Sequence, residues 1–137
     1  MNVVGSSIAR ESDYILYTYA GPEISVATTK AYSTQLIAMY LLAIQAAKVK
    51  DVISEERYAA LIEELGTLPE KIQKTLDDKE RIQWFASKYA NAKDVFFIGR
   101  GIDYAISMEG SLKMKEISYI HSEAYACLLY TSDAADE

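Results

Sequence analysis

The chain has 137 residues, half of them hydrophobic, which is enough to bury a core and excludes an intrinsically disordered protein. Its 14 basic and 20 acidic residues give a net charge of -6 without any run of Lys or Arg, so we expect binding to neither nucleic acid nor an anionic membrane. The single cysteine, Cys127, excludes an intramolecular disulfide, and no signal peptide or membrane span is apparent, so we expect a soluble cytoplasmic protein.

The first part of the chain predicts pieces of an α/β unit. Residues 2–8 have the pattern of a short buried strand that ends in a Gly/Ser turn, and residues 14–21 are rich in β-branched and aromatic residues, which favours a second strand. Residues 23–50 carry the longest helical periodicity. This segment is apolar on most sides, so we expect other elements to cover most of the helix.

Two or three polar helices follow. Ser54 is a good N-cap, Gly66 ends the helix that it starts, and Pro69 suits the first turn of the next. That next helix is predicted to break near Asp77 and Asp78. The polar outer faces indicate a helical connector between two folded units.

A second α/β pattern begins after the connector. Residues 95–98 are consecutively apolar, as in a strand buried in a parallel sheet, residues 99–101 (Gly-Arg-Gly) predict a tight turn, and a helix is expected from about Ile102 to Ser118. The chain is thus predicted to be α/β, with parts of two domains and a complete sheet in neither, which indicates truncation at both ends.

One charged stripe has spacing that chemistry could use. Glu109, Lys113 and Glu116 stand at i, i+4 and i+7, so they share one face of the predicted helix. They could be solvated ion pairs of little energetic weight, or Glu116 could be a general base with Lys113 as its electrostatic partner. Spacing alone leaves both alternatives open.

Three other features carry weaker signals. His121 lies beside Tyr119 and Ile120, where a structural role is the simpler interpretation. The turn at 99–101 matches the dinucleotide fingerprint poorly, because the third glycine is replaced by Tyr104. The hydroxyl-rich segments 5–13 and 25–30 fit helix capping as well as they fit ligand contact.

Several long strings together resemble one family. NVVGSSIARESD, AGPEISVATTKAYSTQLIAMYLLA and VFFIGRGIDYAISMEGSLKMKEISYIHSEAY are similar, in order and spacing, to the isomerase half of glutamine:fructose-6-phosphate aminotransferases, the glucosamine-6-phosphate synthase family. The resemblance implies two flavodoxin-like sugar isomerase (SIS) domains joined by a helical connector. The expected boundaries are 1–52 for the first domain, 53–85 for the connector and 86–126 for the second domain.

The resemblance also implies a reaction and its residues. Ammonia from glutamine passes to fructose-6-phosphate, and the product isomerises to glucosamine-6-phosphate without a cofactor or a metal. By motif match Glu116 is the base, Lys113 is its neighbouring lysine, Val26 contacts the sugar through its backbone, and Thr28 does so at a position where serine is usual. The parent protein is expected to be a homodimer.

The sequence also departs from the family. The glutaminase domain is absent, and residues 127–137 replace the segment with the histidine that assists ring opening; they resemble a translated sequencing adapter, so we predict a non-native tail. The chain alone is therefore expected to be inactive. The alternatives are a SIS-type regulatory module that binds phosphosugars and a helical interaction domain.

Overall fold

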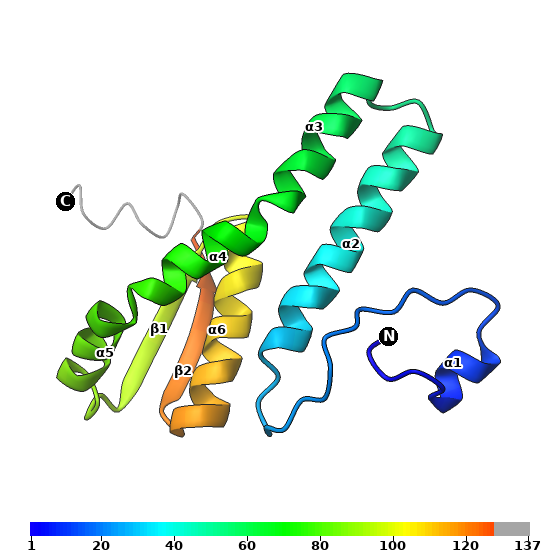
Figure 1. The fold of residues 1–137 in the computed structure, drawn as a ribbon. Coiled ribbons are helices and arrows are strands. Elements are labelled where there is room, and N and C mark those ends of the chain that lie inside the picture. Colours follow the sequence, from blue (N-terminus) through cyan, green and yellow to red (C-terminus); the bar gives the residue numbers. More distant parts are fainter. Residues whose placement is uncertain (128–137) are drawn as a thin grey trace. The chain divides into compact units, whose positions relative to one another are not determined.

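The computed structural model describes residues 1–127 and divides the chain into two compact units, with the boundary between Arg81 and Ile82 (Figure 1). The predicted tail, residues 127–137, lies outside the described residues except for Cys127. The backbone N–H of Cys127 donates to the carbonyl of Gly99 over 2.9 Å, so regular pairing reaches the last described residue.

The first unit opens with a short helix where a strand was expected. α1 spans Ser7–Glu11, and the side chain of Ser6 accepts a hydrogen bond from the backbone N–H of Ala9 over 3.3 Å. Gly5 has a φ of 73°, which turns the chain into this N-cap. The strand predicted at residues 2–8 is therefore wrong, because the Gly-Ser-Ser sequence starts a helix.

The strand predicted at residues 14–21 is also wrong, although the segment lies beside the N-terminus in an extended course. Met1 donates from its amino group to the carbonyl of Leu16 over 2.7 Å, and its carbonyl accepts from the N–H of Thr18 over 2.8 Å, which is the pattern of a single parallel bridge. The ladder stops there. The side chain of Asn2 accepts from the N–H of Ala20 in place of a backbone carbonyl, and Tyr19 has a φ of 50°.

Two packed helices follow in the first unit. α2 spans Lys30–Val49 and α3 spans Glu55–Gly66, capped by Ser54 as expected. Lys48 pairs with Glu55 over 2.8 Å near the turn between the two helices. The prediction that α2 is covered on most sides is wrong, because only Ala31 is buried in it. Among the described residues α3 is the one helix or strand that packs against it.

Two further helices have the predicted break. α4 spans Leu68–Asp77, with Pro69 in its first turn, and α5 spans Lys79–Lys88. The break at Asp77 and Asp78 is confirmed. Neither helix has a buried residue.

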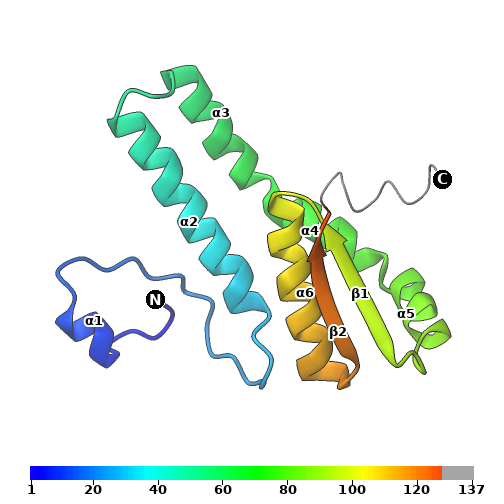
Figure 2. The ribbon, with the colours of Figure 1, turned by 180° about the vertical axis from the view of Figure 1, so that it is seen from behind.

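The second unit is a small parallel α/β layer (Figure 2). β1 spans Asp94–Gly99, α6 spans Ile102–Ser118 and β2 spans His121–Ala126. The strands pair in parallel with Asp94 opposite His121 and Gly99 opposite Ala126, and α6 packs against both. This confirms the α/β class, the strand at residues 95–98 and the helix. The expectation that this strand is buried on both faces is wrong, because Phe96 and Ile98 are 59% and 69% exposed on the face that α6 does not cover. β2 was not predicted.

Candidate functional site

The turn between β1 and α6 requires glycine. A Cβ atom at Gly99 would lie 2.4 Å from the backbone carbonyl atoms of Asp103 and 2.5 Å from the backbone nitrogen of Tyr104. Gly101, the residue before α6, has a φ of 59°, a backbone conformation that residues other than glycine rarely adopt. These two glycines therefore let α6 start immediately beside the end of β1.

α6 brings the predicted charged stripe together. Lys113 Nζ lies 2.6 Å from Glu116 Oε2 and 3.4 Å from Glu109 Oε1. The side chains of Lys113, Glu109 and Glu116 are 20%, 24% and 32% exposed, so they are neither fully solvated nor buried. The geometry is that of a lysine held between two carboxylates.

The charges in this cluster reinforce one another. Lys113 donates a hydrogen bond to Glu116, and this bond, helped by the charges of both carboxylates, raises the pKa of Lys113 above its ordinary value. The lysine is therefore cationic at neutral pH, with its ammonium in direct contact with the Glu116 side chain. A carboxylate can act as a general base, and an ammonium beside it can stabilise nearby negative charge.

Gly110 and Ser111 of α6 make contacts that the sequence did not predict. A Cβ atom at Gly110 would lie 3.0 Å from the ring of Phe97 in β1, so the helix approaches this strand closely. Ser111 and Ser122 are buried, with their hydroxyl oxygens 3.1 Å apart, and Ser122 also donates to the carbonyl of Ser111 over 2.8 Å. The sequence signal that could have predicted these contacts is Gly110 followed directly by Ser111, two small residues that let a strand approach the helix closely.

His121 is the first residue of β2 and follows Glu116 by five residues. Its Nδ1 is 2.9 Å from Asp94 in β1 and its Nε2 is 3.7 Å from Glu123, while the side chain is 59% exposed. These contacts join the first residues of the two strands. The structural interpretation of His121 therefore has direct geometric support.

The other predicted site residues lie in a loop of the first unit. Val26 is 99% exposed, Thr28 is exposed, and Ala27 between them is buried. Glu23 closes this loop, because its Oε1 accepts from the backbone N–H of Thr29 over 2.7 Å, and this bond lowers the pKa of Glu23. Val26 and Thr28 belong to the first unit, and Lys113 and Glu116 belong to the second.

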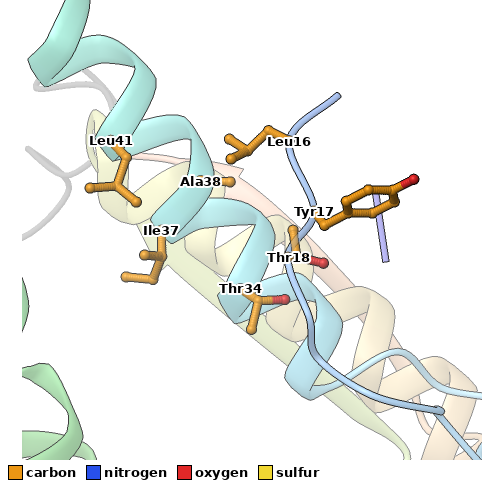
Figure 3. Close-up of a pocket in the computed structure, with 7 residues that line it drawn as sticks. All are labelled: Leu16, Tyr17, Thr18, Thr34, Ile37, Ala38 and Leu41. Carbon is orange, nitrogen blue, oxygen red and sulfur yellow. The ribbon is translucent and has the colours of Figure 1, made fainter. Parts of the chain in front are cut away.

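The first unit also holds a small apolar cavity of about 170 Å³ between the extended segment and α2 (Figure 3). Leu16 extends toward the helix, whereas the ring of Tyr17 points away from it. The cavity is lined by Leu16, Tyr17, Thr18, Thr34, Ile37, Ala38 and Leu41. None of the predicted site residues is among them.

The described residues hold neither a metal cluster nor a membrane-spanning helix. No group of three or more His, Cys, Asp and Glu side chains within residues 1–127 is arranged to hold a metal ion. In the same range no helix combines the length and the apolar character needed to cross a membrane.

Comparison with known proteins identifies relatives over nearly the whole chain. The family model "SIS domain" matches residues 1–45 and 88–132. A glutamine–fructose-6-phosphate aminotransferase (isomerizing) from Caldanaerobacter subterraneus subsp. tengcongensis is 64% identical over 124 residues, which are 90% of this chain and 20% of that protein. The enzyme of the same name from Clostridium tetani is 59% identical over 91% of this chain and 21% of its own length.

Solved structures agree with these relatives. The C-terminal domain of glucosamine-fructose-6-phosphate aminotransferase from Francisella tularensis has a TM-score of 0.88 and 41% identity, over 91% of this chain and 35% of that one. A putative phosphosugar isomerase from Clostridium difficile 630 has a TM-score of 0.83 and 28% identity, over 98% of this chain and 40% of that one. The chain thus spans about a fifth of the length of the curated relatives that it matches. These matches confirm the resemblance found in the sequence: the chain belongs to the SIS domain family and corresponds to part of the SIS region of glutamine–fructose-6-phosphate aminotransferases.

Proposed function

We propose that this chain forms part of the sugar isomerase site of a glutamine:fructose-6-phosphate aminotransferase, with Glu116 as the general base. The family match and the 64% identity to such an enzyme support the reaction. The observation that carries the residue assignment is the 2.6 Å contact between Lys113 and Glu116 on a helix packed against a parallel sheet.

The proposed chemistry is a proton transfer on a phosphorylated sugar. Converting the imine of fructose-6-phosphate to glucosamine-6-phosphate moves a proton between C1 and C2. An ionised carboxylate can take that proton from one carbon and return it to the other. Lys113, 2.6 Å from Glu116, supplies positive charge that stabilises the negative charge developing on the substrate during the transfer.

The proposal includes the remaining expectations from the sequence. Val26 and Thr28 contact the sugar, the segments 1–52 and 86–126 belong to two SIS domains, and residues 127–137 are not native. The ammonia comes from a glutaminase domain outside these residues. The parent enzyme acts as a homodimer in the cytoplasm without a cofactor, and the chain by itself does not turn over substrate.

A chimera tests the proposal. Residues 1–126 of this chain replace the matching stretch of the Caldanaerobacter aminotransferase, and formation of glucosamine-6-phosphate from fructose-6-phosphate and glutamine is measured. We expect Glu116→Gln to lower kcat by about 10²- to 10⁴-fold, the usual contribution of a general base, while binding of fructose-6-phosphate is retained.

The matched control removes the other carboxylate from the same lysine. Glu109→Gln deletes a charge 3.4 Å from Lys113 but no proposed base, so kcat should stay within a few-fold of the unsubstituted chimera. Turnover that survives Glu116→Gln would refute the base assignment. An unsubstituted chimera that binds fructose-6-phosphate but forms no product would favour the alternative function, a regulatory module that binds phosphosugars without reacting with them.

A further inference from the structure

The two buried serines form a closed pair between α6 and β2. Ser122 is 0% exposed and Ser111 is 3% exposed. The hydroxyl of Ser122 has one hydrogen, which it donates to the carbonyl of Ser111 over 2.8 Å. The hydrogen in the 3.1 Å contact between the two hydroxyls must therefore come from Ser111. Each hydroxyl is satisfied, and both bonds join the helix to the strand.

A second contact holds the same turn of the helix against the other strand. Gly110 precedes Ser111 and faces Phe97 of β1, with so little space that an added Cβ would lie 3.0 Å from the ring. Two consecutive residues of α6 are thus held by two different strands. Rotation of α6 about its axis would break one contact or the other.

The charged stripe lies on the far side of the helix from Ser111. At about 100° per residue, Glu109, Lys113 and Glu116 project roughly 160°, 200° and 140° around the axis from Ser111. A helix with side chains has a radius of about 5 to 6 Å, so a rotation of about 20° moves a carboxylate at its surface by about 2 Å. The serine pair therefore controls where the stripe points.

We propose that Ser122, through its bonds to Ser111, is a positioning residue that sets the rotation of α6 and thereby the direction of Glu116. This inference rests on the proposed function in taking Glu116 to be the base. It adds a residue on β2 that touches neither Glu116 nor Lys113 and acts through the helix.

The first experiment measures the rotation in the 137-residue chain and needs no activity. In the unsubstituted protein, NMR should show NOEs between the ring of Phe97 and the α-protons of Gly110. Ser122→Ala should cause loss of these NOEs while NOEs within α6 remain. Ser87→Ala is the control, because Ser87 also donates to a carbonyl, that of Trp84, over 2.8 Å but is exposed on α5. Unchanged Phe97 to Gly110 NOEs in a folded Ser122→Ala protein would overturn the inference.

The second experiment separates positioning from stability in the chimera. We expect Ser122→Ala to lower kcat about 10-fold or more, since a misplacement of about 1 Å can cost about 100-fold, while the KM for fructose-6-phosphate changes little. Ser111→Ala keeps the bond from Ser122 to the main-chain carbonyl at position 111, so its effect should be smaller and in the same direction. If Ser122→Ala does not fold, the kcat of Ser111→Ala tests whether the serine pair positions α6.

The outcomes distinguish the inference from the function on which it rests. If Glu116→Gln abolishes turnover but both serine variants keep the kcat of the unsubstituted chimera, the positioning role is wrong and the proposed function stands. If Glu116→Gln leaves turnover intact, the base assignment fails, and the NOE measurement still decides whether the serines fix the rotation of α6.

Discussion

Removing the hydroxyl of Ser122 should destabilise the protein more than removing that of Ser111. In Ser122→Ala, the buried hydroxyl of Ser111 loses its partner, and an unsatisfied buried polar group costs about 1 to 3 kcal/mol. In Ser111→Ala, the hydroxyl of Ser122 keeps its acceptor, the main-chain carbonyl at position 111, so only one hydrogen bond is lost, worth about 0.5 to 1.5 kcal/mol.

The double variant sharpens this prediction. With both hydroxyls gone, no buried side-chain oxygen is left unsatisfied, so the double variant should be more stable than Ser122→Ala alone. The free energy of unfolding is measured by urea denaturation of the 137-residue chain, with Ser87→Ala as an exposed control expected to change it by about 0.5 kcal/mol or less. A double variant less stable than Ser122→Ala would refute the reasoning, because the cost would then come from lost bonds and not from an unpaired hydroxyl.

Three further predictions concern the glycine at the end of β1, the loop carboxylate Glu23 and the lysine of the charged stripe. Gly99→Ala should lower the free energy of unfolding by about 1 to 3 kcal/mol in urea denaturation, because its Cβ meets main-chain atoms at 2.4 Å, whereas Gly66→Ala, with open space, should be neutral or slightly stabilising. The pKa of Glu23 is lowered in the folded loop, so its contribution to stability is present above pH 4.5 and is lost as the pH falls below that value. An NMR titration should show the lowered pKa of Glu23, and Glu23→Gln should remove this pH-dependent contribution to stability. The pKa of Lys113 is raised above 10.5, so the stability contributed by the Lys113–Glu116 pair is complete below pH 10.5 and is lost as the pH rises further. Glu116→Gln should move the pKa of Lys113 back toward 10.5. An NMR titration of Lys113 that is unchanged by this substitution would show that the pair does not form in solution.

The charged stripe was predictable because helical spacing is local. Once residues 102–118 form a helix, Glu109, Lys113 and Glu116 must share a face whatever else the chain does. The turn at Gly99 and Gly101 was predictable for a similar reason, since a strand that passes directly into a helix needs residues without side chains there.

The strand predicted at residues 14–21 failed for a non-local reason. Its β-branched and aromatic residues suit a pleated surface, but a strand forms only where a neighbour supplies the ladder, and here Met1 alone provides main-chain bonds. The opposite error concerns β2. The sequence HSEAYA carries little strand propensity, yet pairing with β1 and burial of Ser122 make it a strand.

The sequence by itself determined the family, the helix periodicities and the alignment of three charged residues on one helix face, because each depends on the order of neighbouring residues along the chain. Tertiary structure alone decided that β1 and β2 pair in parallel, that two serines become a satisfied buried pair, and that most of α2 stays uncovered. These features depend on which distant segments of the chain meet. Whether a residue is buried is decided by the segments that pack against it and not by its own side chain.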